Sequence, residues 1–136
     1  MASIFTKIIN GEIPCYKVAE NNKFIAFLDI FPLTKGHTLV IPKKEVDYVF
    51  DLDSETYIGL MEFSKQIANA IKKAIPCNRI SVSIIGLEVP HAHVHLIPIN
   101  NMSDCNFSNP KLKLSKEEFE SIAKKISEQI SLFSSP

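Results

Sequence analysis

Three of the four histidines in this chain lie at alternate positions of one short run, His91-Ala-His93-Val-His95. A strand has a period of two, so the spacing predicts three imidazoles on one face and the apolar residues between them on the other. Imidazoles can attack phosphorus, hold phosphate oxygens and assist a leaving group. The run therefore favours nucleophilic catalysis at a phosphorus centre, with His93, flanked on both sides, as the nucleophile.

Two other interpretations of the histidine run stay open. One is a polar strand surface that faces solvent and has no chemical role. The other is a metal site, because imidazole is a common metal ligand. On a straight strand His91 and His95 lie about 13 Å apart, too far for one ion with bonds of about 2.0–2.1 Å to hold all three. No acidic or thiol ligand follows at close spacing, which disfavours the metal site.

The elements that must position this run begin with strands. Aromatic and β-branched residues predict strands over residues 23–30, 37–41 and 79–85. The histidine run is predicted to form a further strand over residues 89–97, ended by Pro98. The first two strands are joined by about six residues, a common loop length, and are expected to pair.

Two helices are predicted from apolar periodicity. Apolar residues at steps of three and four predict a helix of about 20 residues over positions 54–75. Ser115 and Glu118 have the spacing of a capping box, which predicts a C-terminal helix over about residues 115–131. The order of elements predicts one α+β domain over residues 1–136, with a largely antiparallel sheet covered by helices.

Composition narrows the classes of protein. With 15 basic and 15 acidic residues the net charge is zero, which argues against binding to nucleic acid or an anionic membrane through bulk electrostatics. No apolar run approaches the roughly 20 residues that span a bilayer, and no secretory signal is recognisable. Three widely separated cysteines, at positions 15, 77 and 105, fit a reducing, cytoplasmic setting.

The sequence resembles the histidine triad (HIT) family and is similar to its nucleotide-binding Hint-like branch. The family signature, His-x-His-x-His followed by two apolar residues, is matched by residues 91–97. The resemblance runs from about residue 4 to residue 98. It implies a HIT-like core over about residues 4–100, in which a largely antiparallel sheet of about five strands packs with the long helix, and it makes the C-terminal helix an extension. It includes the segments Gly11-Glu12-Ile13-Pro14, Phe27-Leu28-Asp29-Ile30 and Gly36-His37-Thr38-Leu39-Val40-Ile41-Pro42-Lys43.

The resemblance implies a mechanism through a covalent nucleotidyl-histidine. His93 is expected to attack the α-phosphorus of a nucleoside 5′-monophosphate derivative, and water then hydrolyses the intermediate. His95 is expected to contact the phosphate and the leaving group. His91 supports His93 through its ring or its backbone carbonyl, and His37 extends that network.

The resemblance also implies a substrate-binding set. Asp29 is expected to accept hydrogen bonds from the ribose hydroxyls, with a turn cap before Phe31-Pro32 as the alternative. Other expected substrate-binding residues are the neighbouring Ile30, an apolar slot for a purine base, and two residues of the loop before the histidines. The slot comprises Ile4, Phe5, Ile8, Phe27 and Leu39, and the loop residues are Glu88 and Val89.

Two features of the family pattern are missing here. Leu87 stands where a glutamine is expected near the phosphate, so backbone N–H groups of Glu88 and Val89 are the remaining donors there. Some relatives hold zinc through an N-terminal Cys-x-x-Cys, a later histidine and a triad histidine. Here the first three positions are Ser3, Thr6 and Glu45, so no structural zinc and no cofactor are expected.

The expected activity is metal-independent hydrolysis of purine nucleoside 5′-phosphoramidates or related monophosphate derivatives. One alternative is a dinucleoside polyphosphate hydrolase, which the short loop around Leu87 disfavours. Another is a nucleotide-binding regulatory module with little catalysis. The resemblance also implies a homodimer joined through the long helix and an edge strand.

Overall fold

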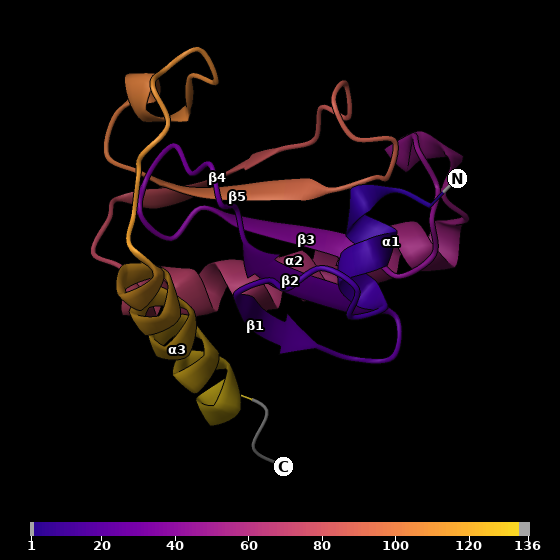
Figure 1. The fold of residues 1–136 in the computed structure, drawn as a ribbon, viewed down its shortest axis with the longest axis horizontal. Helices are drawn as coiled ribbons and strands as arrows, with labels where there is room; N and C mark the ends of the chain where they lie inside the picture. Colours follow the sequence, from indigo (N-terminus) through magenta and orange to yellow (C-terminus); the bar gives the residue numbers. More distant parts are fainter. Residues whose placement is uncertain (1, 134–136) are drawn as a thin grey trace.

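Five strands form one antiparallel sheet in the computed structural model, which describes residues 2–133, with side chains through residue 130 (Figure 1). The order across the sheet is β1-β2-β3-β5-β4. The strands are β1 (Lys17–Glu20), β2 (Phe24–Leu28), β3 (Thr38–Pro42), β4 (Arg79–Ser83) and β5 (Val94–Ile99). With its helices on the sheet, the chain has the predicted α+β class.

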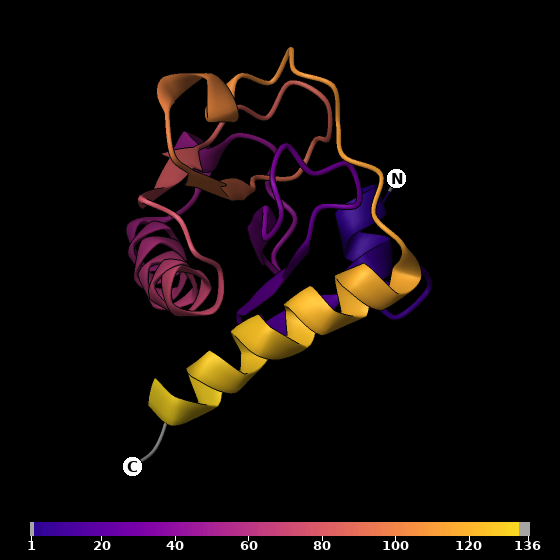
Figure 2. The same cartoon turned by 90° about the vertical axis from the view of Figure 1, so that its left-hand side faces the viewer.

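The two faces of the sheet carry different helices: α1 (Ile4–Ile9) lies on one side, and α2 (Ser54–Ala74) lies on the other (Figure 2). The third helix, α3 (Lys116–Phe133), packs along α2 and against β1. Two short 3-10 helices, η1 (Val49–Asp51) and η2 (Met102–Cys105), lie in the connections. Within the described residues no helix combines the length and the apolar character needed to cross a membrane.

The helix predicted over residues 54–75 is confirmed as α2. The Asp53 side chain caps its first turn by accepting a hydrogen bond of 3.1 Å from the backbone N–H of Thr56. Lys72 and Lys73 lie in its last turn, where the helix dipole favours positive charge. Its inner face, including Leu60 and Ile67 with no exposed surface, packs on the sheet.

The capping box predicted for the C-terminal helix is also confirmed. The Ser115 hydroxyl accepts from the backbone N–H of Glu118 at 3.1 Å, and the Glu118 carboxylate accepts from that of Ser115 at 3.2 Å. The buried face of α3 includes Phe119, which stacks on Tyr16 with ring centroids 4.8 Å apart. This helix therefore closes the core beside β1.

The predicted strand over residues 89–97 is wrong at both ends, because β5 begins at Val94 and ends at Ile99. His91 and His93 precede the strand, so the histidines do not share one strand face. Pro98 continues the strand because β3 pairs with β5 only from Val94 to Leu96, which leaves Pro98 paired to β4 alone. The segment before β5 is held instead by a hydrogen bond of 2.7 Å from the Ala92 N–H to the Val46 carbonyl.

Candidate active site

A cavity of about 460 Å³ lies on the face of the sheet that carries α1. Every site residue predicted from the sequence lines it, except His91. Helix α1 supplies Ile4, Phe5 and Ile8; β2, β3 and β5 with their connections supply Phe27, Asp29, Ile30, His37, Leu39 and His95; and the loop before β5 supplies Glu88, Val89 and His93. The fold therefore brings together residues that are up to 91 positions apart, from Ile4 to His95.

The ring of His93 is held so that one nitrogen faces the cavity. Its Nδ1 lies 2.7 Å from the backbone carbonyl oxygen of His91, and a carbonyl oxygen only accepts, so Nδ1 carries the proton. The other nitrogen, Nε2, then has a free lone pair in the neutral ring. Phe5 packs edge-on against this ring at a centroid distance of 5.0 Å, which fixes its plane. The arrangement holds a nitrogen with a free lone pair at a fixed angle, as a nucleophile requires.

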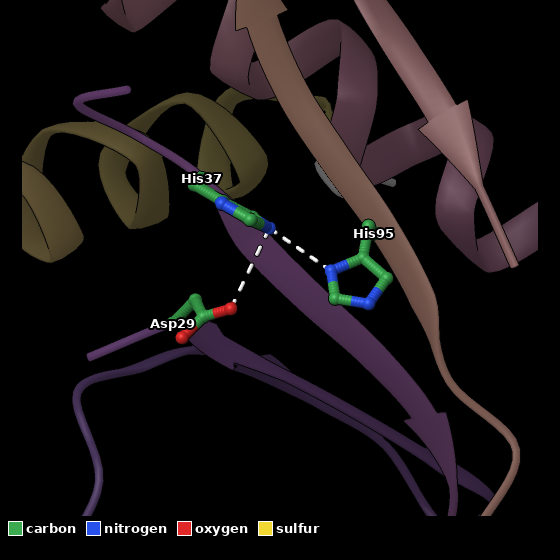
Figure 3. Close-up of side chains that lie close together, drawn as sticks. All are labelled: Asp29, His37 and His95. Carbon is green, nitrogen blue, oxygen red and sulfur yellow. Dashed lines mark hydrogen bonds and ion pairs between the residues drawn. The ribbon is translucent and has the colours of Figure 1, made fainter. Parts of the chain in front are cut away.

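Hydrogen bonds also determine the tautomers of His37 and His95 (Figure 3). The backbone N–H of Leu33 donates to His37 Nδ1 at 3.0 Å, so the proton of the neutral His37 ring is on Nε2. That atom lies 3.0 Å from His95 Nδ1, which must therefore accept. His95 is left with a proton on Nε2, on the side of the ring away from His37. This N–H can donate to a phosphoryl oxygen or to a departing atom.

Burial keeps these imidazoles neutral. It lowers the pKa of His37 to about 4 and that of His95 to about 3, because charging a ring out of contact with water is unfavourable. Burial also lowers the pKa of His91, against the raising effect of its bond to a backbone carbonyl. At neutral pH all three rings are therefore uncharged, and the tautomers above are the relevant forms.

His91 lies behind the cavity and connects His93 to two other elements. Its Nε2 donates to the backbone carbonyl of Pro42, at the end of β3, at 2.7 Å. Its Nδ1 accepts from the hydroxyl of Ser3, the N-cap of α1, at 2.8 Å. Because the His91 carbonyl orients His93, α1 and β3 both contribute to the position of the His93 ring.

A polar cluster continues outward from His91 and occupies the positions at which some relatives carry zinc ligands. Thr6 donates its backbone N–H to the Ser3 hydroxyl at 3.0 Å. The Glu45 carboxylate accepts from the backbone N–H of Ser3 at 2.7 Å and from the Thr6 hydroxyl. These bonds lower the pKa of Glu45 to about 2. Hydrogen bonds thus hold the N-terminus of α1 here, and the expected lack of a structural zinc stays a prediction.

Asp29 fits both of its predicted roles in part. One carboxylate oxygen caps the turn that follows β2 by accepting from the backbone N–H of Phe31 at 2.9 Å. The other oxygen points into the cavity, 3.6 Å from His37 Nε2. Ligand atoms of Asp29, His37 and His95 lie within 4.8 Å of one another, close enough to hold a metal ion. Hydrogen bonding already accounts for the 3.0 Å spacing of the two imidazoles. Ribose binding by Asp29 stays a prediction.

The sequence did not identify two residues that complete the cavity wall. Phe107 and Lys111 come from the segment between β5 and α3. An aromatic side chain between Asn106 and Ser108 was the available signal. Leu87, in the loop before β5, is 88% exposed at the edge of the same cavity. Its side chain offers no hydrogen bond to a phosphate.

Comparison with known proteins supports the same family throughout. The HIT domain family model matches residues 10–102. An uncharacterized HIT-like protein of Borreliella burgdorferi is 38% identical over 135 residues, with 93% of this chain and 97% of the relative covered. The adenosine 5′-monophosphoramidase hnt1 of Schizosaccharomyces pombe is 35% identical over 132 residues, with 96% and 99% covered. A crystal structure of a hypothetical histidine triad nucleotide-binding protein from Sulfolobus tokodaii has a TM-score of 0.85 at 34% identity, with 95% of this chain and 92% of that chain covered. The chain belongs to the HIT family.

Proposed function

We propose that this protein hydrolyses purine nucleoside 5′-phosphoramidates through a covalent nucleotide on His93, without a metal ion. The observation that carries the proposal is the bond of 2.7 Å between His93 Nδ1 and the His91 carbonyl, which leaves Nε2 as a nucleophile beside the cavity. Membership of the HIT family supports nucleotide hydrolase activity in general. The name of the Schizosaccharomyces pombe relative, an adenosine 5′-monophosphoramidase, favours a phosphoramidate over other derivatives.

In the first step His93 Nε2 attacks the α-phosphorus, and the bond from phosphorus to the departing nitrogen breaks. The amine takes one proton through His95 Nε2, and a proton from solvent restores the neutral ring of His95. In the second step water attacks phosphorus and the bond to His93 breaks. The products are the nucleoside monophosphate and the free amine, and the water proton returns to solvent.

The nucleoside is proposed to lie with its base against α1. Phe5 and Phe27 pack edge to face there with ring centroids 5.7 Å apart, and Ile4, Ile8 and Leu39 complete an apolar wall suited to a purine. Asp29 lines the same cavity, with one carboxylate oxygen 3.6 Å from His37 Nε2, and is proposed to accept hydrogen bonds from the ribose hydroxyls. Glu88 and Val89 line the cavity beside His93 and offer backbone N–H groups to the phosphate.

We also propose that two copies associate through β4 and α2. β4 is an edge strand, and an unpaired edge is a template for a second strand. Large apolar side chains are exposed around it, including Val82 on β4, Ile58 on α2 and Phe50 on η1, at 52%, 54% and 66%. Sedimentation at about micromolar concentration is expected to give a dimer, and Val82→Glu a monomer. A monomeric unchanged protein contradicts the proposal.

The test of the activity is release of AMP from adenosine 5′-phosphoramidate in the presence of a chelator. The unchanged protein is expected to release AMP and, after rapid acid quenching, to carry a nucleotide on His93 that mass spectrometry detects. His93→Ala is expected to lose at least about a thousandfold in turnover while still binding AMP, because a nucleophile is lost and the cavity remains. An unchanged rate in His93→Ala contradicts the assignment of the nucleophile. AMP binding without turnover in the unchanged protein favours a binding module.

A further inference from the structure

The segment between β5 and α3, residues 100–115 and here called the strap, passes the sheet on the side that carries α1 (Figure 2). Its own hydrogen bonds give it a defined path. The Asp104 carboxylate accepts from the backbone N–H of Asn100 at 2.7 Å, and the Asn109 amide donates to the Ser103 carbonyl at 2.6 Å. The Leu112 N–H donates to the Pro32 carbonyl at 2.8 Å, which attaches the strap beside the cavity.

Phe107 places the strap in contact with His95, the histidine proposed to give a proton to the leaving group. Its ring packs edge-on against His95 at a centroid distance of 4.9 Å and lies 6.3 Å from the ring of His37. His95 Nδ1 is occupied by His37, so its free N–H is the one available to a departing atom. Phe107 lines the cavity next to this ring, so a substituent on that departing atom has the wall formed by Phe107 within reach.

Lys111 places a positive charge on the same wall. Its Nζ donates to the backbone carbonyls of Phe107 and Asn109 at 2.5 and 3.1 Å, so the strap itself fixes the ammonium group. An ammonium has three donors, and these bonds use two of them. Among the described side chains no carboxylate pairs with Lys111. The charge also acts on the histidines, since it helps to lower the pKa of His37.

The neighbouring wall of the cavity offers no competing charge of the same sign. Among its described lining residues, Lys111 is the single lysine or arginine, the carboxylates are those of Asp29 and Glu88, and most of the wall is apolar. The base slot on α1 presents Ile4, Phe5 and Ile8. A negative group on the substrate, apart from its α-phosphate, therefore finds its complementary charge at the strap.

We propose that Lys111, positioned by the strap and by Phe107, selects leaving groups that carry a negative charge, such as the carboxylate of an amino acid joined to phosphorus through its nitrogen. The inference rests on the proposed function, since the leaving group departs in the phosphoramidate reaction. Lys111 contacts the substituent and does not take part in bond breaking. The reaction is the one above, in which the P–N bond breaks and the amino acid leaves with one added proton.

The experiment compares two substrates that differ in one charge, the adenosine 5′-phosphoramidates of β-alanine and of β-alaninamide. The ratio of their kcat/KM values is measured for the unchanged protein and for Lys111→Gln, Lys111→Glu and Lys111→Arg. Taking the ratio within each protein, and then between proteins, removes the difference in intrinsic reactivity of the two amines. Lys113→Gln is the matched control, because Lys113 lies on the same strap and does not line the cavity.

Lys111→Gln is expected to lower the carboxylate-to-amide ratio about three- to tenfold, as for a partly solvated charge pair. Lys111→Glu is expected to lower it further, Lys111→Arg to preserve it, and Lys113→Gln to leave it unchanged. Rising salt should reduce the ratio in the unchanged protein and leave that of Lys111→Gln nearly constant.

An equal loss on both substrates in Lys111→Gln places Lys111 against the nucleoside phosphate and overturns the proposal. A ratio unaffected by any change at position 111 also overturns it. Either outcome leaves AMP release and the His93 adduct in place, so it is distinct from a failure of the proposed function. That failure is seen as no AMP release from any phosphoramidate by the unchanged protein, and it overturns both.

Discussion

The two faces of the sheet are buried by different means. On the α2 side the central side chains are aliphatic: Val40, Val94 and Leu96 have no exposed surface and pack under Ile67. On the α1 side the same strands and their connections bury imidazoles, with His37 1% exposed and no surface of His91 exposed.

This difference separates stability from chemistry. Burying apolar area is favourable in proportion to the area and requires no particular partner. Burying an imidazole is unfavourable unless each nitrogen has a partner, and on the α1 side both nitrogens of His37 and both of His91 have one. The free nitrogens of His93 and His95 face the cavity, so the unfilled hydrogen-bonding capacity of this face coincides with the site.

The largest effect on stability is expected on the α2 side. Ile67→Ala removes a fully buried side chain and should lower the free energy of unfolding by about 3 kcal/mol. The turnover number of the folded protein should stay the same, because the cavity lies across the sheet. Urea unfolding and AMP release check the two parts. Lys65→Ala, on the exposed side of the same helix, is the control and should change neither. A large loss of turnover in folded Ile67→Ala would contradict the assignment of stability to the α2 side and of chemistry to the α1 side.

Acid should act on the α1 side. His37 and His95 have pKa values of about 4 and 3 in the folded protein, below the ordinary value of about 6.5. Below pH 6.5 the unfolded chain therefore binds more protons than the folded one, and stability falls as pH falls. Together the two rings should remove about 2 kcal/mol between pH 7 and pH 5.5.

The measurement is urea unfolding at several pH values for the unchanged protein and for His37→Gln. Loss of one imidazole should lower the number of protons taken up on unfolding by about half a proton to one proton over this range, so the free energy of unfolding should fall less steeply with falling pH. Parallel pH curves for the two proteins contradict the assignment of buried, neutral rings.

Substitutions of Asp29 distinguish a structural role from a ligand-binding role on the α1 side. Asp29→Asn keeps an oxygen that can cap the turn at Phe31, whereas Asp29→Ala removes the cap. If the carboxylate binds ribose, both variants should weaken AMP binding about tenfold and hardly affect binding of the 2′,3′-dideoxy analogue. Titration calorimetry with both nucleotides decides this. Equal weakening of the two ligands, in Asp29→Ala alone, identifies a structural cap.

The smallest effect is expected from the cluster behind His91. Ser3→Ala removes the N-cap of α1 and the hydroxyl donor to His91, so it should cost about 1 kcal/mol of stability. A severalfold fall in turnover with little change in KM should accompany it, because His91 is less firmly held. Ser3→Thr is the control, since it retains a hydroxyl. Unchanged turnover in Ser3→Ala shows that β3 alone suffices to hold His91.

Sequence reasoning succeeded where a pattern repeats over many residues. The long period of α2 and the capping box of α3 were both confirmed. It did not identify α1 as a helix, because six residues are too few to show a period. The strand through the histidines was wrong because main-chain bonds, such as Ala92 to Val46, outweigh local alternation.

The residues around the cavity also divide into those that a sequence pattern identified and those that it did not. The family motif pointed to the histidines and to the residues that join them in one cavity. Phe107 and Lys111 lie outside any periodic element, and only the path of the strap brings them to His95. Ser3 and Glu45 were recognised from the sequence only as non-ligands at zinc-ligand positions of some relatives. The hydrogen bond between them joins residues 42 positions apart, and no local pattern encodes it.

The hydrogen bond from His93 to the carbonyl of His91 has a consequence for protein engineering. Each amino acid carries this acceptor on its main chain, so no substitution at position 91 deletes it. A designer must preserve the single residue between positions 91 and 93 and the backbone bend that turns the His91 carbonyl toward the ring of His93. The orientation of the His93 ring is thus specified by the course of the chain, and exchanging side chains at position 91 can disturb it only indirectly.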